Sequence, residues 1–175
     1  CTTLIAAPLL LVTSIAANVA VAADAPARKS GLWEMTNVMS GAYAITQTMQ
    51  QCVDEKTDKL TEQSGMQEAQ KHCSKNEISR SGNKVISDSV CKFEGTTATT
   101  HAEFTGDFGS NYRGDIKTTY SPPMQGMAGM QMTITAKWLG PCKPGMKPGD
   151  VVMQGMPGMP GGMKFNPADM QKQMR

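Results

Sequence analysis

This sequence has few of the residues from which pockets, nucleic-acid surfaces and redox centres are usually built. Aromatic residues make up only 5% of its 175 residues, which argues against a large aromatic-lined pocket. The 17 basic and 15 acidic residues nearly balance, so the chain has no basic footprint for nucleic acid. No C-x-x-C motif occurs, which argues against a redox-active cysteine pair and a zinc knuckle. We therefore expect no nucleic-acid partner, and no other partner is indicated.

Motifs for nucleophilic catalysis are missing as well. No G-x-S-x-G motif occurs, and the S-x-x-K spacing of Ser81 and Lys84 falls in a turn rather than at the helix start that this chemistry needs. The remaining titratable candidates are interpreted as ordinary exposed side chains, namely His72, His101, Glu103 and Asp107. We therefore predict that the protein is not an enzyme, and we assign no catalytic residue.

The first part of the chain has the composition of an export signal. Residues 4–23 are apolar and uncharged, and Ala20–Ala22 fits the A-x-A cleavage pattern. We expect a signal peptide over residues 1–23, with cleavage near Ala22 or Ala23. A polar leader over residues 24–30 then precedes the folded domain.

Two other interpretations of this segment are less favourable. A run of 20 apolar residues is long enough for a retained membrane anchor, but Pro8 and Asn18 disfavour that reading. A lipid on Cys1 is disfavoured because a long apolar run follows that residue directly. The expected location is therefore periplasmic or secreted, with no membrane contact after cleavage.

Four cysteines remain once the signal is removed, and an even number in an exported chain indicates a disulfide framework. The segment from Cys73 to Cys91 is typical of a β-hairpin, because residues 81–83 are the turn formers Ser-Gly-Asn. A turn centred on the glycine places Cys73 opposite Cys91, at a separation that suits a disulfide. If that pair forms, Cys52 must pair with Cys142.

Alternation of apolar and polar residues with a period of two runs through most of residues 31–142 and is clearest in residues 130–138. About seven short strands separated by turn signals predict a mainly β domain, an antiparallel meander that forms a curved sheet or a small barrel. Residues 107–109 are expected to form a hairpin loop with Gly109 in the left-handed conformation, and residues 121–123 to end a strand. The expected cross-strand pairs are Ile78 with Ile86, Asn76 with Asp88, and Phe104 with Tyr112.

Two segments lack this alternation. Residues 54–72 are polar and rich in helix formers, so we expect one or two short surface helices, interrupted at Gly65. The tail, residues 143–175, is rich in Met, Gly and Pro and is expected to be flexible and disordered, with a frayed helix over residues 168–175.

Methionine is the most unusual component of the chain, with 15 residues. Thioether sulfur is a soft ligand that favours Cu(I), so closely spaced methionines form a hypothetical site for Cu(I) or Ag(I). Flexible apolar contacts and scavenging of oxidants are the other interpretations. The methionines of the hypothetical metal site are Met124, Met127, Met130, Met153, Met156, Met159 and Met163.

Four short motifs together resemble the domain-of-unknown-function family 3617. They are GLWE at Gly31–Glu34, QCV at Gln51–Val53, the Cys73 and Cys91 pair around an R-S-G-N turn, and G-x-C at Gly140–Cys142. The resemblance implies a small exported bacterial protein with a disulfide-bonded domain over residues 31–142, and it supplies no catalytic residue.

These observations lead to one functional hypothesis and one alternative. The hypothesis is a periplasmic, non-enzymatic binding or structural module whose ligand the sequence does not identify, with no cofactor. The alternative is a protein that binds Cu(I) or Ag(I) through its methionine clusters.

Overall fold

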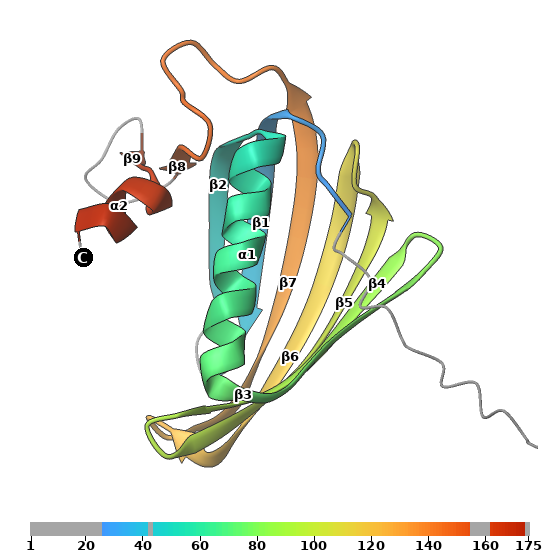
Figure 1. Ribbon diagram of the computed structural model, residues 1–175, viewed down its shortest axis with the longest axis vertical. Helices are drawn as coiled ribbons and strands as arrows, with labels where there is room; N and C mark the ends of the chain where they lie inside the picture. Colours follow the sequence, from blue (N-terminus) through green and yellow to red (C-terminus); the bar gives the residue numbers. More distant parts are fainter. Residues whose placement is uncertain (1–25, 42–43, 155–161, 174–175) are drawn as a thin grey trace, which may run out of the picture.

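The computed structural model describes residues 26–41, 44–154 and 162–173, and the predicted signal peptide lies outside this part of the chain. Within it, one nine-stranded antiparallel sheet is accompanied by two helices (Figure 1). The strand order across the sheet is β3-β4-β5-β6-β7-β1-β2-β8-β9. The bounds are β1 (Gly31–Ser40), β2 (Ile45–Val53), α1 (Glu55–His72), β3 (Cys73–Ser81), β4 (Lys84–Phe93), β5 (Thr96–Asp107), β6 (Asn111–Met124), β7 (Met127–Gly140), β8 (Val151–Met153), β9 (Met163–Phe165) and α2 (Pro167–Gln173).

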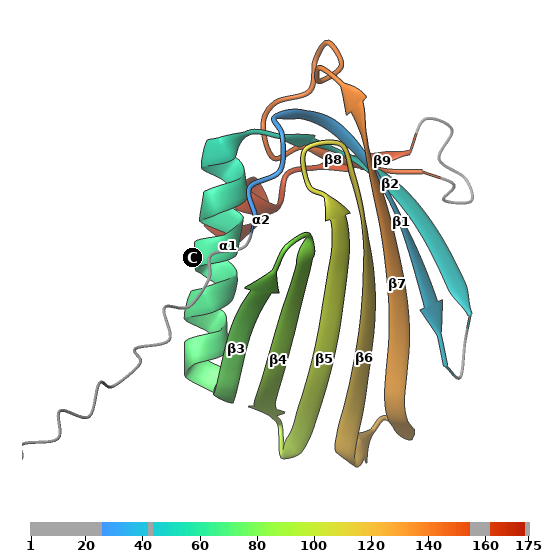
Figure 2. The same cartoon turned by 90° about the vertical axis from the view of Figure 1, so that its right-hand side faces the viewer.

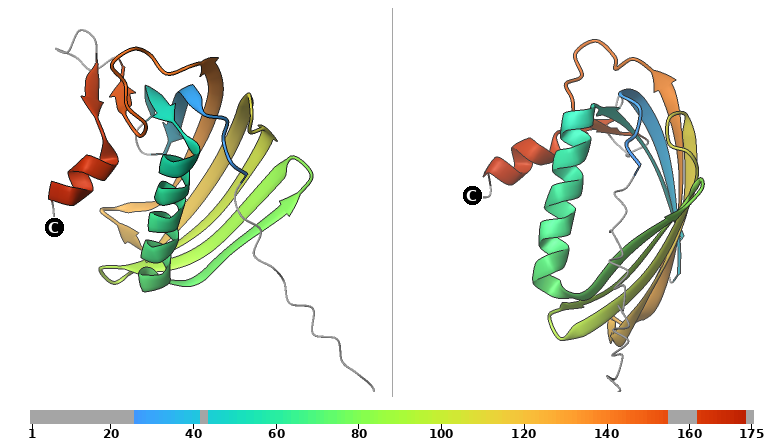
Figure 3. Two further views of the ribbon diagram at one scale, coloured as in Figure 1. Left: turned by 45° about the horizontal axis from the view of Figure 1, so that its top comes forward. Right: turned by 45° about the vertical axis from the view of Figure 1, so that its right-hand side comes forward.

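The sheet is strongly curved, and α1 stands against its concave side (Figures 2 and 3). This helix connects β2 to β3, two strands that lie far apart in the sheet order. The prediction of a mainly β, antiparallel fold is confirmed. The question left open by the sequence is also answered: β3 and β9 form the two ends of the order, so the sheet does not close into a barrel.

The concave face carries the apolar half of the alternating pattern. Met35 lies opposite Ala136, and Ala136 lies opposite Tyr112, so these side chains share one face. The most deeply buried cluster is Trp33, Val53 and Ala136, with Met35 and Tyr112 packed against it. The core is thus small and lies near the end of the sheet where α1 begins.

Helix α1 is a single element of 18 residues, so the expected interruption at Gly65 does not occur. Asp54 caps its start, accepting from the backbone N–H of Thr57 while the Thr57 side chain interacts with the backbone of Asp54. The helix dipole interacts favourably with the acidic Glu55 and Asp58 in the first turn and with basic residues in the last turn. No residue of α1 is buried, so packing on the sheet contributes little to holding it in place.

The hairpin of β3 and β4 has a different register from the predicted one. Its turn consists of Gly82 and Asn83 alone, so Ile78 lies opposite Ser87 rather than Ile86, and Asn76 is likewise displaced by one. Two-residue turns match the twist of paired strands, and Gly82 supplies the positive φ, +60°, that such a turn needs. The prediction of a turn centred on Gly82 alone is therefore wrong.

A β-bulge nevertheless places the two cysteines of this hairpin opposite each other. The pairing shifts by one residue between Cys73 and Lys75, and this shift brings Cys73 back opposite Cys91. The structure contains this disulfide and also the Cys52–Cys142 disulfide.

The loop between β5 and β6 is also displaced from its predicted position. It spans residues 108–110, and the Asp107 carboxylate accepts hydrogen bonds from the Gly109 N–H and the Ser110 hydroxyl at 2.9 and 2.8 Å. This network, rather than a left-handed glycine, shapes the turn. Phe104 consequently lies opposite Gly114 and not Tyr112.

Gly114 is required at its position because the ring of Phe104 covers it. A Cβ atom on Gly114 would come within 2.5 Å of that ring. Phe104 still meets Tyr112 diagonally, edge to face, with ring centroids 6.5 Å apart. The predicted aromatic contact therefore exists, although the register that was to produce it is wrong.

Residues 121–123 do not end a strand as predicted. Strand β6 continues to Met124, with a cis Ser121–Pro122 bond and an irregularity in its pairing with β7 that accommodates the prolines. Gln125 and Gly126, both at positive φ, then form the turn into β7.

In the described part of the predicted disordered tail, residues 143–154 and 162–173, two short strands and a helix are present. Strand β8 pairs with β2, β9 pairs with β8, and α2 follows Asn166, whose side chain accepts from the Ala168 N–H. The Asp150 carboxylate, which is buried, binds Lys164 and Asn166. Three-residue strands are too short to give a periodic signal, so the pairing could not be predicted.

Neither described helix is long and apolar enough to span a bilayer.

We predict that the two disulfides contribute unequally to stability. The Cys52–Cys142 bond closes a much longer loop, and chain entropy assigns it about 4.6 kcal/mol against about 3 kcal/mol for Cys73–Cys91. Urea denaturation of the two paired Cys→Ser variants should rank them in this order. The opposite order would show that loop-closure entropy does not determine how much each disulfide contributes to stability.

We also predict that the tail hairpin, formed by β8 and β9, detaches from β2 in acid. Burial alone would raise the pKa of Asp150, but hydrogen bonds from Lys164, the Lys147 N–H and Asn166 lower the pKa to about 2. A carboxyl group whose pKa is lower in the folded than in the unfolded protein stabilises the fold at pH values above its unfolded-state pKa. This stabilisation is lost as the pH falls, here between about pH 4 and pH 2.

The amide resonances of β8 and β9 report this change. They should move toward random-coil shifts over that pH range in the wild type, and Asp150→Asn should show the altered shifts already at neutral pH. Wild-type resonances that stay in place down to pH 2 would contradict the prediction.

Candidate functional site

A cavity of about 580 Å³ lies between α1 and the concave face of the sheet. Its sheet side is apolar and includes Val85, Phe104 and Tyr112, whereas α1 contributes mostly polar residues. The volume falls in the range of small-molecule sites. Three aromatic side chains border the cavity, including Phe108, so the low aromatic content did not prevent a partly aromatic pocket from forming.

Arg28, in the segment before β1, holds the helix and the sheet together. Its guanidinium forms a two-pronged ion pair with Asp58 on α1, and the Nε–Oδ2 distance is 3.1 Å. The same group donates to Gln51 on β2 at 3.2 Å and contacts the Met35 sulfur on β1 at 3.8 Å. The side chains of Arg28 and Asp58 are only 15% and 19% exposed, so the pair is shielded from solvent.

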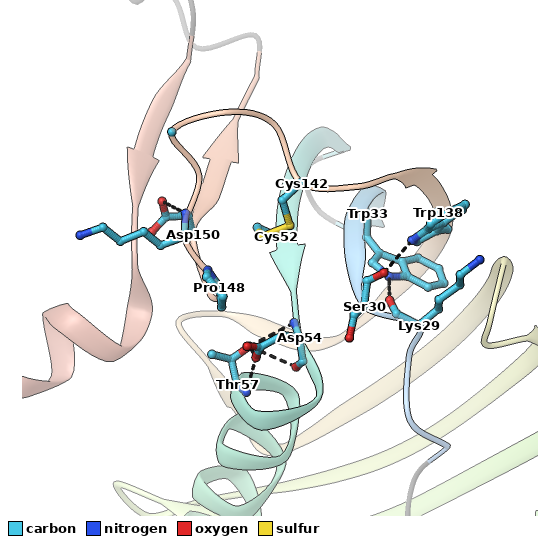
Figure 4. The surroundings of a disulfide bond; sticks show 12 residues. Lys29, Ser30, Trp33, Cys52, Asp54, Thr57, Trp138, Cys142, Pro148 and Asp150 are labelled. Atoms are coloured by element: carbon cyan, nitrogen blue, oxygen red, sulfur yellow. Dashed lines mark hydrogen bonds between the residues drawn. A yellow bond between two sulfur atoms is a disulfide. The ribbon is translucent and has the colours of Figure 1, made fainter.

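The position of Arg28 depends on two tryptophans that fix the backbone beside it (Figure 4). The Trp33 indole N–H donates to the Lys29 carbonyl at 2.7 Å, and the Trp138 indole N–H donates to the Ser30 carbonyl at 3.1 Å. The Lys29 ammonium also lies 3.7 Å from the centre of the Trp138 ring. Residues 26–28 of the predicted polar leader therefore form part of the cavity wall.

Gly31 explains why this segment can pass so close to β7. Its φ of +136° is unfavourable for other residues, and a Cβ atom there would overlap the Gly140 carbonyl and the Trp138 ring. The glycine and the tryptophan of the GLWE motif thus serve the same purpose, which is to dock the chain that carries Arg28.

The electrostatics of the cavity favour a fixed positive charge beside an un-ionised phenol. Burial would lower the pKa of Arg28, but hydrogen bonding to Asp58 and the charge of Asp58 raise it overall. Burial raises the pKa of Tyr112, and the charge of Arg28 opposes this only in part. At neutral pH the cavity therefore contains a paired guanidinium and a neutral phenol, which can orient a ligand by hydrogen bonding.

Both disulfides lie next to the ends of α1. Cys52 comes two residues before the cap residue Asp54, and Cys73 is the C-terminal cap of the helix. Cys52–Cys142 anchors the beginning of the helix near one side of the sheet, and Cys73–Cys91 anchors its end at the other. These bonds restrain the two ends of α1, and the Arg28–Asp58 ion pair adds a contact at its first turn.

The structure divides the methionines of the hypothetical metal site into separate groups. Met124 and Met127 flank the β6–β7 turn, and Met130 lies on the concave face with the Tyr120 hydroxyl 3.1 Å from its sulfur. Met153 and Met163 pair with each other near the opposite end of the sheet, as Figure 2 shows for β8 and β9. Met156 and Met159 lie outside the described residues.

The titratable residues considered from sequence are in separate surface contacts. His101 binds Asp88 at 2.8 Å, and Glu103 pairs with Lys84. His72 contacts Glu68 at 3.0 Å, and Asp107 shapes its own loop. Among the described residues, no three His, Cys, Asp or Glu side chains gather closely enough to hold a metal ion.

The sequence matches a family described as protein of unknown function (DUF3617) over residues 28–142. The chain belongs to this family. The matched region begins at Arg28 and ends at Cys142, so it contains both disulfides and the cavity lining except Pro26 and Ala27, but not β8 and β9. No curated protein and no solved structure matches the chain.

Sequence reasoning missed the cavity residues because their contacts join distant segments. Arg28 and Asp58 carry no motif, and the capping and tryptophan interactions become visible only in three dimensions. The one available signal was the tryptophan of GLWE, because a buried indole N–H needs a hydrogen-bond acceptor.

We predict that Asp58→Asn destabilises the protein by about 2 kcal/mol, because it leaves the shielded Arg28 without its charged partner. The matched control is Glu55→Gln, one turn away in the same helix, which removes an ion pair to Lys59 whose side chains are largely exposed. Urea denaturation should show a clear loss for the first variant and little change for the second. Equal effects would mean that Arg28 does not hold the helix to the sheet.

Proposed function

We propose that this domain is an exported, non-enzymatic binding module that takes a small molecule with an apolar body and a polar end into the cavity beneath α1. The observation that carries the proposal is the cavity itself. An ordinary amphipathic helix fills the space against its sheet with apolar side chains, whereas α1 has no buried residue and leaves about 580 Å³ open.

The arrangement of the walls supports this ligand chemistry. Val85, Phe104 and Tyr112 offer apolar contact from the sheet, and Arg28 offers hydrogen-bond donors and positive charge at one end. Because Asp58 already balances that charge, the cavity suits a polar or weakly anionic group better than a strongly charged one.

Export is supported by the disulfides and the apolar segment at residues 4–23. Two disulfides in one small domain are compatible with an oxidising compartment outside the cytoplasm.

The binding proposal is tested by filling the cavity. Ser87, on β4, borders the cavity, and Ser87→Phe should block it. The matched control is Thr99→Phe, which adds the same ring to an exposed position of the adjacent strand β5. Wild type and Thr99→Phe should enhance the fluorescence of N-phenyl-1-naphthylamine, an uncharged dye with an apolar body and one N–H donor, whereas Ser87→Phe should not.

Thermal unfolding of each variant separates this outcome from a general loss of structure. Equal dye binding by Ser87→Phe and the control, in folded proteins, would contradict the proposal. Dye binding that grows only when the proteins begin to unfold would contradict it as well.

The non-enzymatic part of the proposal has its own test. Among the described residues, the histidines and carboxylates considered as catalysts lie in separate surface contacts rather than around the cavity. A panel of peptide, ester and glycoside substrates should therefore show no turnover. Sustained hydrolysis that depends on the protein would overturn this part.

A further inference from the structure

A row of methionines crosses one end of the sheet. Met49 on β2 lies opposite Met153 on β8, and Met153 lies opposite Met163 on β9. Directly opposed residues of antiparallel strands point to the same face, with Cβ atoms roughly 5 Å apart. Three thioethers from three adjacent strands are therefore next to one another, although one of them is distant from the other two in the sequence.

The strands that carry this row are fixed by hydrogen bonds on both sides of it. The Cys52 N–H donates to the Asp150 carbonyl at 2.9 Å, and the Gln154 N–H donates to the Thr48 carbonyl at 2.9 Å. The Asp150 carboxylate, bonded to Lys164, adds a side-chain link from β8 to β9. The register that aligns the sulfurs is thus defined by contacts that do not involve the methionines.

The surroundings of the row suit a cation of low charge. Met49 and Met153 are half-buried, and Met163 is 37% exposed, so the row is open to solvent at its outer end. Lys164 points its ammonium to Asp150 and the Gly145 carbonyl. The row continues to Met35, but the Arg28 guanidinium already contacts that sulfur, and its charge would repel a cation there.

We propose that Met49, Met153 and Met163 form a binding site for one soft monovalent cation, Cu(I) or Ag(I). Thioether sulfur prefers such ions, and the long unbranched side chain of methionine allows three sulfurs from neighbouring strands to converge on one ion. The site is separate from the cavity and goes beyond the proposed small-molecule function. Strands β8 and β9, which carry Met153 and Met163, lie outside the region that matches the family.

The key test is Met49→Leu, because this residue distinguishes a site built by strand pairing from a local cluster in the tail. Leu conserves volume and apolar character, so the variant should fold. Ag(I) nitrate in chloride-free buffer is the probe, because it needs no reductant that would attack the disulfides. Cys1 is changed to Ser in any preparation that retains residues 1–23.

Calorimetric titration should show one bound Ag(I) in the wild type. Met49→Leu and Met153→Leu should each weaken binding by roughly tenfold or more. The control variant, Met124→Leu with Met127→Leu, removes two methionines at the far turn and should bind as the wild type does. The methyl resonances of Met49, Met153 and Met163 should shift together on addition of Ag(I).

Two outcomes would overturn the proposal. One is no Ag(I) uptake by the wild type. The other is unchanged affinity in Met49→Leu, which would assign any uptake to methionines outside the paired strands. A paired change of Met156 and Met159 to Leu completes the comparison: abolished binding there, together with full binding by Met49→Leu, would place the ion elsewhere in the tail.

Discussion

The position of α1 over the sheet depends on covalent bonds next to both of its ends rather than on a packed interface. Cys52 and Cys73 tie those ends to opposite sides of the curved sheet, and Arg28 bridges the gap at the first turn of the helix through Asp58. A helix with no buried residue would ordinarily separate from its sheet, since burial of apolar area is what holds such layers together. Because the disulfides replace that burial, the space beneath the helix stays open.

The same constraint explains why the segment before β1 is ordered. Trp33 and Trp138 donate their indole N–H groups to the backbone on either side of the bend, and Gly31 allows the close approach to β7. These contacts, drawn in Figure 4, fix the backbone next to Arg28, whose guanidinium reaches Asp58 on α1 and Gln51 on β2. Gly31 and Trp33 of the GLWE motif therefore help to close the cavity at the end where α1 begins.

Local patterns predicted the strands and both cysteine pairs, but not the details of pairing. Alternation located β7 well because 14 residues give a long periodic signal. The predicted register of the hairpin containing Ile78 was wrong by one residue because its turn has two residues. The β-bulge near Cys73 shifts the pairing back by one, so the two cysteines still lie opposite each other. The contacts of Arg28, the tail hairpin and the row of Met49, Met153 and Met163 join segments far apart in sequence, where no local pattern carries information.

Hydrogen exchange of α1 tests most directly whether disulfides, and not packing, hold the helix in place. Exchange is compared between the native protein and the variant with both Cys73 and Cys91 changed to Ser, using amides of β5 and β6 as the internal reference. Our account predicts that the C-terminal half of α1 loses protection while β5 and β6 keep theirs, because those two strands are paired on both sides. Unchanged protection of α1 in the variant would contradict it.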